Sequence, residues 1–131
     1  MKKKVILVLE IFFMLIFIVY LFMLMDTNNV MDEARAVFMD EVDDKLISTA
    51  LLEKYSNEGR LSKLTSPKID LKLLRLFTIH NFYDGYIWVW YNYEVRDGNN
   101  NLVRGSWNIK SKWTIHKENS KWRVVSIDER P

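Results

Sequence analysis

The sequence predicts an α+β fold, in which one N-terminal transmembrane helix is followed by a small cone of bent α-helix packed on a four-stranded antiparallel meander. Three observations predict it. Residues 5–25 are almost all apolar, residues 30–55 carry apolar side chains at three- and four-residue spacing, and residues 86–129 alternate between apolar and polar side chains. A chain of 131 residues has room for one compact domain and one appendage.

The composition excludes several classes of protein. The chain has no cysteine, which excludes a disulfide framework, a thiolate zinc site and an iron–sulfur cluster. Charged residues make up 27% and aromatic residues 14%, with only four glycines and two prolines, so the chain is neither a disordered tail nor a low-complexity segment. A formal net charge of +2 is too small to indicate a nucleic-acid partner.

The apolar run at the N terminus has the length of a membrane span. Val5–Met25 contains one charged residue, Glu10, and as a helix it would extend about 31 Å, close to the ~30 Å hydrocarbon core of a bilayer. Lys2, Lys3 and Lys4 precede the run, whereas the stretch from Asp26 to Asp44 holds seven acids and one arginine. Because positive flanks stay in the cytoplasm, we expect a cytoplasmic N terminus and an extracytoplasmic C-terminal part at the cell membrane.

The chain is thus predicted to consist of residues 1–25, a cytoplasmic stub and anchor, and residues 26–131, an extracytoplasmic α+β domain. A cleaved signal peptide is the main alternative, because Ala34–Ala36 resembles a cleavage site. That site lies well beyond the run, and the run exceeds the usual 7–15 apolar residues of a signal peptide, so an uncleaved anchor is favoured. Glu10 either reaches nearby headgroups or contacts a basic group of a partner membrane protein.

The first half of the outer part is acidic and has helical periodicity. Residues 26–59 sum to a charge of −6 and residues 60–131 to +6, so the two halves are complementary. Two apolar stripes at helical spacing are rotated relative to each other, which predicts a bend near Asp43–Asp44. The first stripe is Val30, Ala34, Val37, Phe38 and Val42; the second is Ile47, Ala50, Leu51, Lys54 and Tyr55.

The second half alternates with the period of a strand. Tyr86–Arg96 and Leu102–Lys117 are joined by a Gly/Asn-rich loop, which is typical of a hairpin, and Lys121–Glu129 follows another turn. Leu71–Phe82 supplies a first strand, although its leucines also suit a helix. The apolar faces are predicted to be Ile87, Val89, Tyr91, Tyr93 and Val95 in one strand and Val103, Trp107, Ile109, Trp113 and Ile115 in the next.

This order of elements, closing on Trp122-Arg123-Val124 and Ile127, resembles the cystatin-like cone of the nuclear transport factor 2-like superfamily over residues 28–131. The resemblance implies a bacterial extracytoplasmic protein, since small cones of this kind follow a single membrane anchor in components of conjugation and secretion machines. It also implies where an enzyme would have its site, because enzymes on this fold place an Asp, often with His or Tyr, inside the cone.

The sequence predicts no catalytic, metal or cofactor site. His80, Asp84 and His116 are the candidates for proton transfer, with a His80/Asp84 pair as the enzyme alternative, but none has a partner placed by the sequence. The two histidines lack the spacing of metal ligands, and the chain has no Gly-rich phosphate loop and no nucleophile elbow. We therefore expect a protein that is not an enzyme and holds no cofactor.

Aromatic residues are the most unusual feature of the sequence. Seven of the twelve residues from Phe82 to Tyr93 are aromatic. Trp88 and Trp90 have the opposite parity to the apolar face of their strand, so with Lys110 and Lys112 they form a candidate partner surface. Alternatively both faces of this strand are covered.

A strip of basic residues runs along the second half of the chain. It is either a binding surface for anionic wall polymers or lipid headgroups, or the solvated face of an edge hairpin. Its members are Arg104, Lys110, Lys112, Lys117, Lys121 and Arg123.

These observations favour a membrane-anchored, non-enzymatic interaction or assembly module whose partner is another envelope protein or a second copy. A ligand-binding cone is the alternative, with an apolar or sugar-like molecule held among Tyr91, Trp107 and Trp113. A filled core with an exposed aromatic patch would favour the interaction module, and an empty apolar pocket would favour the ligand binder.

Overall fold

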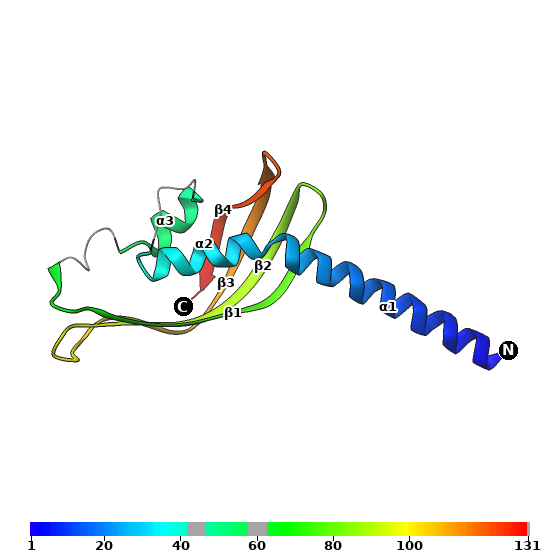
Figure 1. The fold of residues 1–131 in the computed structure, drawn as a ribbon, viewed down its shortest axis with the longest axis horizontal. Helices are drawn as coiled ribbons and strands as arrows, with labels where there is room; N and C mark the ends of the chain where they lie inside the picture. The colour runs from blue at the N-terminus through cyan, green and yellow to red at the C-terminus, as the bar shows by residue number, and fades with distance from the viewer. Residues whose placement is uncertain (42–46, 58–62, 131) are drawn as a thin grey trace.

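The computed structural model describes residues 1–41, 47–57 and 63–130, and it has the expected α+β class (Figure 1). Among the described residues, three helices precede four strands. Their bounds are α1 (Lys2–Asp26), α2 (Asn28–Phe38), α3 (Thr49–Tyr55), β1 (Lys68–His80), β2 (Asp84–Arg96), β3 (Leu102–Glu118) and β4 (Lys121–Arg130). The strands form one antiparallel sheet in the order β1-β2-β3-β4, which confirms the predicted meander.

Helix α1 extends away from the sheet (Figure 1). None of its residues is buried. It continues through Thr27 into α2, and the Thr27 hydroxyl donates a 2.8 Å hydrogen bond to the Met23 carbonyl at the junction. Within the described ranges, this helix is the one long and apolar enough to cross a membrane, by length and composition only. A signal sequence has the same properties.

The two short helices, α2 and α3, cover one face of the sheet, called here the inner face. Most members of the two predicted stripes are buried or partly buried, but Lys54 is exposed and Val42 lies outside the described residues. Val30, Ala34, Val37 and Phe38 are buried in α2, and Leu51 and Tyr55 are buried in α3. The bend predicted near Asp43–Asp44 lies outside the described residues. On the sheet side, every residue of the predicted apolar face of β2 is buried: Ile87, Val89, Tyr91, Tyr93 and Val95.

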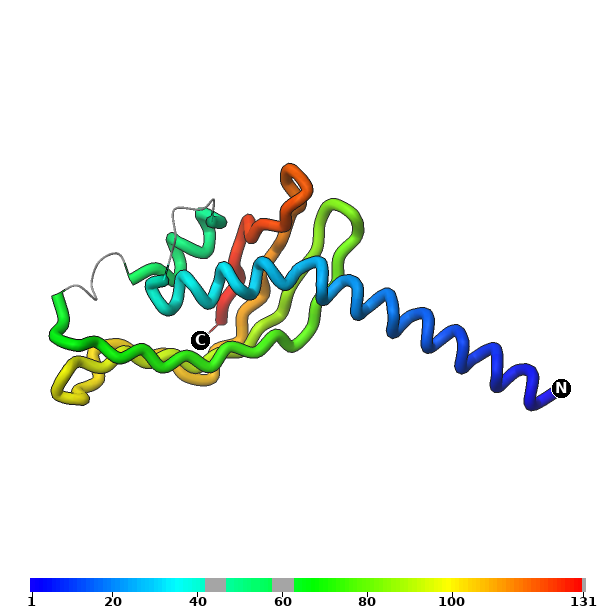
Figure 2. Tube along the Cα trace, in the orientation of Figure 1, coloured from blue at the N-terminus to red at the C-terminus, as the bar shows by residue number. Residues whose placement is uncertain are grey.

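Strand β1 confirms the strand expected over Leu71–Phe82, shifted to begin at Lys68 and end at His80, so the helical alternative was wrong. Its pairing with β2 is interrupted between Arg75 and Phe77, where one extra residue forms a bulge. Beyond the bulge the strands curve towards α1, and the β1–β2 hairpin lies at the end of the sheet near that helix (Figure 2).

The apolar face predicted for strand β3 is correct at only one end of the strand. Trp113 and Ile115 are buried as expected, but Trp107 and Val103 are about half exposed, and they lie on the outer face of the sheet. A bulge at Trp107 and Asn108 causes the difference, because the register shifts there against β2 and Asn108 adopts a φ of 54°. One extra residue reverses the alternation, so Arg104 faces inward, where its guanidinium lies 5.8 Å from the Tyr93 ring.

Candidate functional site

The interior of the fold is an aromatic core with a polar cluster at its centre. Phe38 stacks on Tyr55 at 4.3 Å between ring centroids, and the ring of Tyr91 lies 5.0 Å from that of Phe38. The Tyr55 and Tyr91 hydroxyls donate to the two carboxylate oxygens of Glu129 at 2.7 and 2.8 Å. The Trp113 indole donates to the Tyr55 hydroxyl at 3.0 Å. The cluster therefore pairs its donors and acceptors internally.

The electrostatics of this cluster favour neutral phenols. Burial raises the pKa of Tyr55 and of Tyr91 above the ordinary value, and the adjacent Glu129 carboxylate raises both further. Both tyrosines therefore stay protonated and serve as hydrogen-bond donors to the carboxylate. An ionised phenol here would face the Glu129 carboxylate in a desolvated environment. Ionisation of either tyrosine is therefore disfavoured, and the hydrogen bonds to Glu129 are kept.

The pocket predicted among Tyr91, Trp107 and Trp113 is wrong as a single site. Tyr91 and Trp113 are 3% and 0% exposed and lie in the filled core. Trp107 is on the opposite face of the sheet because of the bulge in β3. No one cavity can be lined by all three side chains.

The structure brings two of the three proton-transfer candidates together and places the third, His80, apart from them. Asp84 pairs with His116 across the β2–β3 ladder, with 2.6 Å between Oδ1 and Nδ1. His80 instead faces Asp26 at the end of α1, 3.9 Å from Nε2 to Oδ2, and its ring lies 4.5 Å from that of Trp122. The His80/Asp84 pair considered from the sequence is not formed. In the part of the chain that the structure describes, no group of three or more His, Asp or Glu side chains could hold a metal ion.

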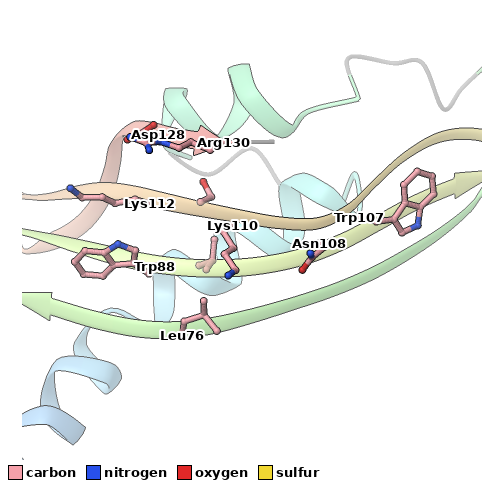
Figure 3. A pocket seen from close by; sticks show the side chains of 10 residues that line it. Leu76, Trp88, Trp107, Asn108, Lys110, Lys112, Asp128 and Arg130 are labelled. Carbon is pink, nitrogen blue, oxygen red and sulfur yellow. The ribbon is translucent and has the colours of Figure 1, made fainter.

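The outer face of the sheet carries an open groove of about 760 Å³, defined here as the outer groove (Figure 3). It collects residues from all four strands, since β4 pairs with β3 and brings Asp128 and Arg130 beside Lys112 and Lys110. Its lining consists of Leu76, Trp88, Val89, Trp107, Asn108, Lys110, Ser111, Lys112, Asp128 and Arg130.

Lysines and aromatic rings alternate along this face. The Lys112 ammonium lies 4.3 Å from the centroid of the Tyr86 ring and 5.8 Å from that of Trp88, and Lys72 lies 5.6 Å from that of Trp90. These are cation–π distances, at which the face of the ring attracts the ammonium group. Trp88 and Trp90 are each partly exposed, so the outer-surface parity predicted for them holds.

Trp107 is the member of the outer groove that the sequence reasoning placed on the wrong face. Its indole donates to the Glu94 carboxylate at 2.7 Å and lies over Gly105, where a Cβ would collide with the ring. Glycine inside a strand and asparagine just beyond the tryptophan are signals of a bulge, because Asn tolerates positive φ better than most residues. Gly105 and Asn108 are therefore the residues from which the bulge could have been predicted.

The basic strip predicted from the sequence divides between two faces. Lys110 and Lys112 line the outer groove, where Arg130 and one acid, Asp128, join them. The others have partners elsewhere. Arg104 donates a hydrogen bond to the Asn57 amide oxygen, and three residues form ion pairs: Lys117 with Asp26, Lys121 with Glu33 and Arg123 with Glu118. The Lys121–Glu33 contact, at 3.0 Å, joins the acidic helices to the basic sheet.

Comparison of the chain with protein-family models, with curated proteins and with solved structures gave no match. The function of the chain is therefore inferred from the arrangement of its described residues.

Proposed function

We propose that the chain is a single-pass membrane protein whose outer part is a non-enzymatic interaction module, with the outer groove as its contact surface. Residues 1–25 are the cytoplasmic stub and anchor, and residues 26–131 lie outside the cytoplasm of a bacterial cell. The apolar length of α1, its lysine flank and the acids that follow it support this orientation. The resemblance to the cystatin-like cone is consistent with the same placement.

One observation carries the functional proposal: aromatic side chains fill the inner face, yet tryptophans and lysines also line the outer one. The described residues pack the inner face with buried aromatic side chains, which argues against a ligand-binding cone. Partly exposed tryptophans beside a groove are typical of protein contacts, where such rings supply much of the binding energy. With Lys110, Lys112 and Arg130 against Asp128, the groove favours an acidic segment of another envelope protein or of a second copy.

Photocrosslinking in native membranes tests the contact surface. A photoreactive amino acid at position 110, inside the outer groove, should give an adduct whose mass identifies an envelope protein or a second copy. The same probe at position 99, in the exposed β2–β3 loop, serves as the control. Gly105→Ala should lower the yield at position 110 because the new Cβ displaces the Trp107 indole. Equal yields at positions 110 and 99 would contradict the proposal.

Protease treatment of intact protoplasts tests the orientation. A C-terminal epitope should be lost, whereas an N-terminal epitope should remain in the membrane fraction on a short fragment. Survival of the C-terminal epitope would contradict the proposed orientation. Release of the domain without residues 2–26 would identify α1 as a cleaved signal.

A further inference from the structure

The end of the sheet beside α1 carries an exposed apolar surface that the outer groove does not explain. It is defined here as the hairpin patch and comprises Phe77, Ile79, Phe82, Tyr83 and Tyr86. Phe82 is 86% exposed and Tyr83 is 70% exposed, although both occupy a turn where polar residues are common. Large apolar side chains grouped in this way mark a contact with another surface.

The turn itself does not require these aromatic side chains. The Asn81 side-chain oxygen accepts the backbone N–H groups of Tyr83 and Asp84 at 2.7 and 2.8 Å. The Tyr83 carbonyl accepts the backbone N–H of Lys117 at 2.8 Å. The backbone and one asparagine thus hold the turn together, while the rings of Phe82 and Tyr83 extend into the surroundings.

Direct contact with α1 fixes the position of the hairpin patch along the anchor. The Phe77 ring stacks on that of Tyr20, with centroids 5.6 Å apart and an angle of 20° between the planes. An apolar groove of about 380 Å³ runs between the two elements, lined by Val19, Met23 and Ile79 among others. Figure 1 shows α1 leaving the sheet at the β1–β2 hairpin, at the end opposite the β2–β3 loop.

The depth of this contact follows from helix geometry. Tyr20 precedes Met25, the end of the apolar run, by five residues, or about 7.5 Å at 1.5 Å per residue. If Val5–Met25 spans the hydrocarbon, Tyr20 and Phe77 lie in its outer part. His80, at the end of β1, faces Asp26 just beyond the run, which places the adjacent turn with Phe82 and Tyr83 near the boundary with the headgroups. Tyrosine and tryptophan are enriched at this level of a bilayer.

We propose that the hairpin patch inserts into the outer-leaflet interface beside α1, so that the domain is seated on the bilayer. Lipid is favoured over a protein partner because the patch is continuous with the anchor and shares its depth. This inference rests on the proposed role of α1 as a membrane anchor. It adds a second membrane contact, made by a β-hairpin, which fixes the orientation of the outer groove relative to the membrane.

Environment-sensitive fluorophores on the full-length protein in vesicles test the inference. The chain has no cysteine, so a single Phe82→Cys gives a unique label site. In phosphatidylethanolamine and phosphatidylglycerol vesicles, this label should be quenched by a nitroxide on the lipid headgroup and should be several-fold less accessible to aqueous iodide than an Asn99→Cys label. A Phe13→Cys label in the middle of α1 reports on the anchor.

The outcomes separate the inference from the proposed function. A Phe13 label quenched by acyl-chain nitroxides together with an iodide-accessible Phe82 label would leave the anchor standing and overturn the inference. A Phe13 label accessible to iodide would overturn the anchor itself. Shielding of the Phe82 label without quenching by lipid nitroxides, or shielding that disappears on dilution to one copy per vesicle, would assign the patch to a second copy and would also overturn the inference.

Discussion

At the scale of single residues, specific partners hold several polar groups of the core, whereas the buried Thr78 hydroxyl has no hydrogen-bond partner among the described residues. Glu129 is the main example of a partnered group, since its two oxygens accept the hydroxyls of Tyr55 and Tyr91. Asn57 is another, because its amide exchanges hydrogen bonds with the Tyr93 hydroxyl at 2.7 and 2.9 Å. A buried acceptor that loses its donor costs roughly 1–3 kcal/mol, so these residues specify one packing of helices on the sheet.

Alkaline unfolding should report on the Tyr55–Tyr91–Glu129 cluster. The pKa of each tyrosine is raised in the folded state above its ordinary value of 10.0, so the folded chain keeps protons that the unfolded chain releases. The stability from this difference is complete below about pH 10 and decreases as the pH rises further, by about 1.4 kcal/mol per pH unit for each tyrosine. Urea unfolding of the full-length protein in detergent should show this slope, and Tyr91→Phe should make it shallower. A slope unchanged by Tyr91→Phe would contradict the assignment.

At the scale of elements, the sequence predicts a strand well where its alternation is unbroken. Strand β2 has no break within its buried face, and parity alone placed Trp88 and Trp90 on the outer side. Parity failed in β3 upstream of Asn108, because a bulge depends on local backbone geometry that alternation does not encode. Asp128 and Arg130 could not be assigned to the outer groove from the sequence, since they reach it only through the register of β4 on β3.

The bulge in β3 predicts that two tryptophans six residues apart differ sharply in their effect on stability. Trp113→Ala removes a fully buried ring and should lower the free energy of unfolding by about 3–5 kcal/mol. Trp107→Ala removes a ring that is 49% exposed and should cost about 1 kcal/mol or less. Urea titration of both variants measures the difference. Similar losses would mean that Trp107 belongs to the core and that the bulge does not form.

At the scale of the whole molecule, the anchor and the sheet are joined by a small set of polar contacts. Arg75 donates to the Leu24 carbonyl, the Thr27 hydroxyl and the Asn28 side chain at 2.8–3.1 Å, where α1 meets α2. Asp26 accepts the Trp122 indole N–H at 2.7 Å from β4. Contacts from both edge strands, β1 and β4, therefore hold the end of α1. They fix the orientation of the anchor relative to the sheet.

Loss of the Arg75 contacts should loosen the anchor without unfolding the domain. Arg75→Met leaves three acceptors without their donor, and the orientation of α1 relative to the sheet should become variable. Spin labels at Lys3→Cys and Asn99→Cys, in full-length protein in lipid nanodiscs, should give one narrow distance distribution in the parent and a broader one in Arg75→Met. Arg75→Lys should give an intermediate width, because one ammonium cannot reproduce the planar fork that reaches three acceptors. Equal widths in the parent and Arg75→Met, with the variant folded, would show that the hairpin patch and α2 hold the anchor without Arg75.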